Sequence, residues 1–128
     1  MAHLTPMEIF ERAKEFQQCA DYAVQKSFIN GCAISSYAAL FWAARAALAY
    51  EGLDRPNWRH SELRSKFTDE LIQNRSRYPQ QFGTWLSDAY LLRTSAQYLL
   101  VPPQSKRVRR MINHAKEFIH KAEEVIQK

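Results

Sequence analysis

Arg93 is the residue of this 128-residue chain whose type and position most suggest chemistry. On a helix it falls on the same stripe as Leu86, Ala89 and Tyr90. A guanidinium keeps its charge at neutral pH, so it needs a partner wherever it leaves water. Three partners are open: a carboxylate inside the fold, a second copy of the chain at a dimer seam, or a bound phosphate.

Tyr98 follows Arg93 by five residues, a rise of about 7.5 Å along a helix axis. Phosphate recognition could use the phenol as a hydrogen-bond partner beside the guanidinium. Acid–base catalysis is harder, because a phenol with a pKa near 10 is a poor general base at neutral pH.

A second candidate is the basic run Lys106, Arg107, Arg109 and Arg110, which opens the last expected helix. Cations at a helix N-terminus are unfavourable because they oppose the macrodipole, which suggests that the run is there to contact a binding partner. Residues 1–52 carry a net charge of −1, whereas residues 53–128 carry +6. This asymmetry could attract phosphate-bearing partners such as RNA, or it could simply keep one face solvated.

Metal and cofactor chemistry find little support in the sequence. His114 and His120 are six residues apart and fall on different sides of one helix, so no metal site is expected. The chain has no Gly-rich phosphate loop and no Gly-x-Ser-x-Gly motif, and we expect no cofactor. Cys19 and Cys32 are expected to be buried, reduced thiols.

Five helices are expected to position these residues, over about 6–27, 31–51, 60–74, 82–99 and 105 to nearly the C-terminus. Thr5, Pro6 and Glu8 form a helix-start pattern, Asn30-Gly31 predicts a turn, and Gly52 predicts a stop. Short connections favour antiparallel neighbours. The sequence therefore predicts a single all-α domain over 1–128, an up-and-down antiparallel helical bundle of four to five helices.

The helix over 31–51 is expected at the centre of the bundle, because its many alanines let neighbours approach closely. Its apolar stretch, 33–50, contains Arg45 and reads as too short and too polar for a membrane span. With no apolar leader in the first ten residues, we expect a cytoplasmic protein without a membrane partner. The core is expected to include Ile9, Ala13, Phe16, Ala20, Ala23, Ala33, Tyr37, Leu40, Phe41, Ala44, Leu48, Leu63, Phe67, Leu71, Phe82, Trp85, Leu86, Ala89, Leu92, Ala96, Val108, Met111, Ile112, Ala115, Ile119, Ala122 and Ile126.

Several segments together resemble HEPN domains. SSYAALFWAARAALAYEGL (35–53) is similar to their second helix, and LLRTSAQY (91–98) is similar to their Leu-x-x-x-Arg-x-x-Ala-Asp-Tyr signature. HAKEFIHKAEEVI (114–126) resembles their final helix. His60 stands where many members have a histidine, and Phe67 matches the aromatic residue of their third helix.

The resemblance implies a helical bundle that commonly forms a homodimer. Many HEPN proteins are RNA-cleaving toxins or defence effectors, often encoded beside a minimal nucleotidyltransferase that acts as antitoxin. The catalytic form has an arginine followed, after four to six residues, by a histidine, and it needs no metal. Here Arg93 is retained, but Tyr98 fills the later position and Gln97 replaces the usual aspartate.

Three functions follow as hypotheses. The favoured one is a non-catalytic module that binds a nucleotide, RNA or a nucleotidyltransferase partner, as one half of a toxin–antitoxin or two-component system. Its binding residues would be Arg93, Gln97, Tyr98, His60, Lys106, Arg107, Arg109 and Arg110. The second is a metal-independent ribonuclease toxin, in which Arg93 stabilises the phosphate charge and Tyr98 or His60 handles protons. The third is a purely structural dimerisation domain.

Overall fold

The chain forms an all-α bundle in a computed structural model that describes residues 4–127. Within those residues there is no β-strand, and the predicted fold class is confirmed. The elements are α1 (Pro6–Gln25), α2 (Ile29–Tyr50), α3 (His60–Lys66), the π-helix η1 (Phe67–Asn74) that continues α3, α4 (Gln81–Tyr98) and α5 (Ser105–Ile126).

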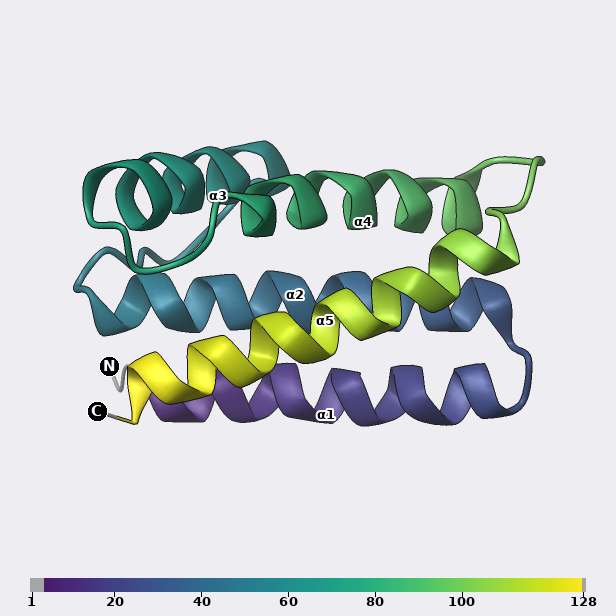
Figure 1. Cartoon of the computed structure of the whole chain (residues 1–128), viewed down its shortest axis with the longest axis horizontal. Coiled ribbons are helices and arrows are strands. Elements are labelled where there is room, and N and C mark those ends of the chain that lie inside the picture. Colours follow the sequence, from purple (N-terminus) through teal and green to yellow (C-terminus); the bar gives the residue numbers. More distant parts are fainter. Residues whose placement is uncertain (1–3, 128) are drawn as a thin grey trace.

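Helix α2 is the central element of the bundle. It lies between α1 and α4, both of which run antiparallel to it, and α5 crosses diagonally over the bundle (Figure 1). By length and composition α2 could cross a membrane, so the sequence argument that its apolar stretch is too short and too polar does not decide the matter. However, 61% of its apolar window is buried inside the protein. Packing against α1, α4 and α5 therefore accounts for the apolar character of α2.

The connection between α1 and α2 corrects one prediction. Asn30 and Gly31 lie inside α2, and the turn falls earlier, where Ser27 adopts a left-handed φ of 59°. The turn is closed by backbone hydrogen bonds from Ser27 and Phe28 to carbonyls at the end of α1. Neither hydrogen bond requires a glycine, so the turn predicted at Asn30-Gly31 is wrong. Gly52, with φ 76°, does end α2 as predicted.

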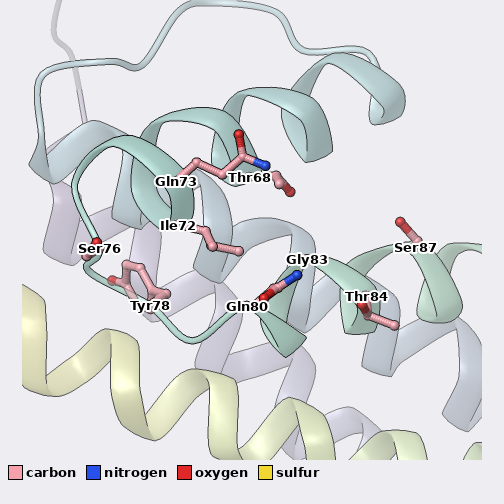
Figure 2. A pocket seen from close by; sticks show the side chains of 9 residues that line it. All are labelled: Thr68, Ile72, Gln73, Ser76, Tyr78, Gln80, Gly83, Thr84 and Ser87. Atoms are coloured by element: carbon pink, nitrogen blue, oxygen red, sulfur yellow. The ribbon is translucent and has the colours of Figure 1, made fainter.

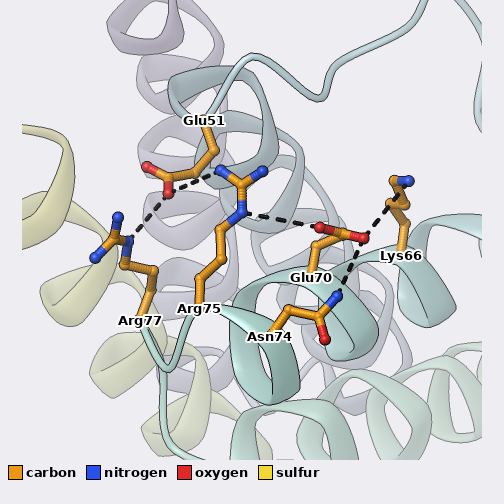
Figure 3. Close-up of polar contacts among 6 residues, drawn as sticks. All are labelled: Glu51, Lys66, Glu70, Asn74, Arg75 and Arg77. Atoms are coloured by element: carbon orange, nitrogen blue, oxygen red, sulfur yellow. Dashed lines mark hydrogen bonds and ion pairs between the residues drawn. The ribbon is translucent and has the colours of Figure 1, made fainter.

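The helix predicted over 60–74 changes character at Phe67, where α3 gives way to η1. Long π-helices are rare and widen the backbone, so neighbouring contacts must hold them. Glu51, at the end of α2, accepts from Arg75 at 3.3 Å and from Arg77 at 3.0 Å. Glu70 in turn pairs with Arg75 and Lys66, and it accepts from Asn74 (Figure 3). This network fixes the end of η1 to α2.

An aromatic cluster joins α5 to η1 and α4. The ring of Phe118 is fully buried and lies 4.7 Å from Phe82, 5.3 Å from Phe67 and 6.2 Å from Tyr78, measured between ring centres. Most predicted core positions are buried. The exceptions are Phe16, Phe41, Ala96 and Ile119, which are only partly buried, whereas Phe10 and Phe118 are fully buried core residues outside the predicted stripes.

The two cysteines differ from the prediction in one respect. Cys32 is buried and its sulfur lies 3.9 Å from Oγ of Ser36, one turn later on α2. Cys19 is exposed on α1, so the expectation that both thiols are buried is wrong. Cys19 lies beside the buried stripe of α1 rather than on it.

Truncating Phe118 tests the aromatic cluster. Phe118→Ala is expected to lower the free energy of unfolding by about 3–5 kcal/mol, because it removes a fully buried ring and leaves a cavity. Ile119→Ala, at the adjacent half-buried position, is expected to cost less than half as much. Urea denaturation measures both values. Equal losses would contradict the assignment of Phe118 to the core.

Candidate functional site

Arg93 lies half-buried on α4 and contacts aromatic rings instead of an acid. Its guanidinium carbon is 5.3 Å from the ring centre of Tyr98 and 6.0 Å from that of Tyr90. Across residues 4–127, no carboxylate comes within ion-pair distance of Arg93. Arg93 could have paired with an internal carboxylate, a second copy of the chain or a phosphate. Among the described residues, the internal carboxylate is not found.

Arg64 on α3 brings a second guanidinium to the same place, and the sequence reasoning missed it. Its guanidinium carbon lies 4.6 Å from the ring centre of Tyr90, so Tyr90 is close to both arginines. Its Nη1 is buried and has no hydrogen-bond partner among the described residues. The sequence did indicate that Arg64 lies near His60, because a spacing of four residues places both side chains on one face of a helix.

His60, the first residue of α3, lies beside these arginines. Its Nδ1 is 2.7 Å from the hydroxyl of Tyr37 on α2, and its ring centre is 5.2 Å from that of Tyr90. Burial lowers the pKa of His60, and the positive charges of Arg93 and Arg64 lower it further. The imidazole is therefore neutral at physiological pH.

Tyr37 decides which nitrogen of His60 carries the proton. Burial raises the pKa of Tyr37 to about 12, so the phenol keeps its proton at neutral pH. The side chain of Arg64 also makes a hydrogen bond to Tyr37, and because a guanidinium can only donate, the phenol oxygen is the acceptor there and its own proton is left for Nδ1 of His60. The phenol therefore donates to Nδ1, and the proton of the imidazole lies on Nε2. In this tautomer the free nitrogen of His60 is a hydrogen-bond donor.

We refer to His60, Arg64 and Arg93 as the arginine–histidine site. All three groups donate hydrogen bonds, and their floor is made by the rings of Tyr37 and Tyr90. Bringing two guanidiniums together without an acid costs free energy through charge repulsion and loss of hydration. A bound anion would relieve that cost, and phosphate matches the planar guanidinium geometry.

The remaining predicted site residues fall in two places. Tyr98 stays next to Arg93 at the exposed end of α4, and Gln97 is exposed beside it. The basic run on α5 lies apart: Arg107 and Arg110 line a pocket of about 140 Å³ on another side of α4. Arg109 donates to Ser105 on its own helix, and Lys106 is exposed. The run therefore does not extend the arginine–histidine site.

His114 belongs to that second pocket, where its ring stacks on Trp85 with centres 4.2 Å apart. Burial lowers the pKa of His114, and Asp88 lines the same pocket. Glu117 and His120 have a Glu-x-x-His spacing, but His120 contacts Glu124 instead. Across residues 4–127, no three His, Cys, Asp or Glu side chains gather into a metal-binding group.

The family comparison covers nearly the whole chain. The family model described as HEPN domain matches residues 7–125, which includes every helix that contributes to the arginine–histidine site. No curated protein matches the chain.

The titration of His60 tests the electrostatics of the site. Its pKa is expected below the ordinary value of about 6.5. Arg93→Met removes one nearby positive charge and should raise it, though not to the ordinary value, because burial is the larger cause. NMR titration of the imidazole measures both. Arg12→Met, which removes a charge from α1, is the control and should leave the pKa of His60 unchanged. If His60 has the same pKa in the wild type and in Arg93→Met, the placement of Arg93 beside it is wrong.

Proposed function

The chain belongs to the HEPN domain family, and from this we propose that it binds a nucleotide or RNA through a phosphate held at the arginine–histidine site. HEPN domains are nucleotide- or RNA-related modules and are often ribonucleases or toxin–antitoxin components. In this proposal the chain is a single, cytoplasmic binding module of that kind, and it needs no metal or cofactor.

The observation that carries the proposal is the pair of guanidiniums of Arg64 and Arg93 without an acidic partner. Three carboxylates of α3 and the flanking loops pair with other cations: Asp54 with Arg45, Glu62 with Arg55, and Glu51 with Arg75 and Arg77. The buried Nη1 of Arg64 is left with an unused donor. A phosphate oxygen would satisfy this donor, and it would also accept from Nε2–H of His60.

A ribonuclease is the second candidate, favoured by the neutral imidazole of His60 close to Arg93. In such a reaction His60 would take a proton from the attacking hydroxyl, and Arg93 would stabilise charge on the phosphate. The tautomer set by Tyr37 opposes this role, because Nε2 already holds a proton. We therefore favour binding over cleavage.

A partner surface completes the proposal. Tyr98, Leu99, Leu100 and Val101 are consecutive and exposed at the end of α4, and Leu100 is fully exposed. An exposed apolar segment of this kind is typical of a protein–protein contact. HEPN domains commonly dimerise and pair with nucleotidyltransferases. We propose that a second copy of the chain covers this segment, which would bring two Arg93–Tyr98 pairs to the dimer interface. A minimal nucleotidyltransferase is the alternative partner.

Removal of either arginine tests the binding site. Arg93→Ala and Arg64→Ala are each expected to weaken binding of a short single-stranded RNA by about tenfold, the loss of one charge-assisted contact. Fluorescence anisotropy at low salt measures the affinity, because phosphate contacts weaken as salt rises. Arg12→Ala carries the same charge change on α1 and should retain binding.

The same samples separate binding from cleavage. RNA that stays intact during prolonged incubation at high protein concentration supports a binding module. Cleavage that disappears in His60→Ala would replace the binding proposal with the ribonuclease. If Arg12→Ala weakens binding as much as Arg93→Ala, the interaction is a general charge effect and the site is wrong.

Leu100→Glu tests the proposed dimer. Sedimentation equilibrium is expected to give a dimer for the wild-type protein and a monomer for the variant, since a charge would be buried in the seam. Leu4→Glu, at an exposed leucine before α1 and outside the segment, should remain dimeric. A wild-type monomer at high concentration would overturn this part of the proposal.

A further inference from the structure

An uncharged groove separates η1 from the first turns of α4 (Figure 2). Its volume is about 770 Å³, several times that of the pocket at Arg107 and Arg110. Hydroxyl and amide groups dominate the lining, with one aliphatic side chain between them. The lining residues are Thr68, Ile72, Gln73, Ser76, Tyr78, Gln80, Gly83, Thr84 and Ser87.

The residues of the arginine–histidine site do not line the groove, but the same helices carry both. On one wall Thr68 follows Arg64 by four residues, about one helical turn. On the other wall Ser87 precedes Tyr90 by three residues, which places both on the same face of α4. Arg64 contacts the ring of Tyr90, so the helices that carry the two walls are joined one turn beyond the groove. From Ser87 to Arg93 the rise along α4 is roughly 9 Å.

Two features set the shape and polarity of the groove. A Cβ atom at Gly83 would come within 2.9 Å of Oγ1 of Thr68, so glycine lets α4 and η1 approach at the floor. The charged side chains of η1 and its flanks lie elsewhere: Glu70 contacts Lys66 and Arg75 in the network of Figure 3. The walls are therefore left with neutral donors and acceptors.

We propose that this groove holds the base of the nucleotide whose phosphate lies on the arginine–histidine site. The amides of Gln73 and Gln80 offer a donor and an acceptor each, as the edge of a base requires, and the hydroxyls of the lining add further partners. Ile72 supplies an apolar contact for the face of the base. This inference rests on the proposed phosphate site and adds the part of the ligand that gives selectivity.

Calorimetric titrations with three probes test the groove: adenosine 5′-monophosphate, ribose 5-phosphate and a trinucleotide RNA. Wild-type protein is expected to bind the mononucleotide about tenfold more tightly than ribose 5-phosphate, as one or two extra hydrogen bonds would give. Ser87→Leu narrows the groove and Gln73→Ala removes an amide. Each should abolish most of this difference while leaving the affinity for ribose 5-phosphate within twofold.

Gln81→Leu is the matched control, because Gln81 is exposed on the first turn of α4 and does not line the groove. It should bind all three probes as the wild type does. All three positions are exposed, and circular dichroism checks that each variant folds. If the trinucleotide binds more tightly than the mononucleotide and Ser87→Leu weakens both, the natural ligand is an RNA strand; equal affinity identifies a free nucleotide.

The outcomes separate the two proposals. Equal binding of mononucleotide and ribose 5-phosphate by the wild-type protein, with both lost in Arg93→Ala, would overturn the groove and leave the phosphate site standing. A loss of ribose 5-phosphate binding in Ser87→Leu would also overturn it, since the groove would then not be separate from the phosphate site. No binding of any probe would overturn the proposed function and the groove together.

Discussion

The close packing of three helices around α2 is the constraint on which the rest of the structure depends. Six alanines of α2 are buried, and their small side chains let α1, α4 and α5 all approach its axis. Larger side chains of α2 hold α3, since Tyr37 and Phe41 both contact His60. Glu51, directly after α2, accepts from the two arginines after η1.

The distribution of acidic partners gives the site its character. Around α3 and η1 the carboxylates form ion pairs that fix loops and helix ends, as Glu51 does for Arg75 and Arg77. Arg64 and Arg93 have no acidic partner among the described residues, and both contact the ring of Tyr90. Repulsion and lost hydration make this arrangement unfavourable by itself. The phosphate proposed to bind at the site would offset this cost.

Helix positions could be predicted well from the sequence, whereas the site could be predicted only in part. Caps and apolar periodicity are local signals, so Thr5, Pro6 and Gly52 marked real helix ends. The Asn30-Gly31 turn was wrong because the chain turns at Ser27, a residue with no strong preference for a left-handed φ. Arg93 and His60 were both singled out, and the four-residue spacing of His60 and Arg64 was a local signal, but nothing local indicated that Arg93 lies beside them.

The sequence by itself determined the all-α fold, the central place of α2 and the family. These depend on patterns that repeat within one helix, where a side chain's neighbours are three or four residues away. The tertiary structure decided which donors converge, because Arg93 on α4 is separated along the chain from His60 and Arg64 on α3 by η1 and its loop. It also decided that Arg107 and Arg110 lie on another side of α4. Such groupings depend on how helices cross, which no local spacing specifies.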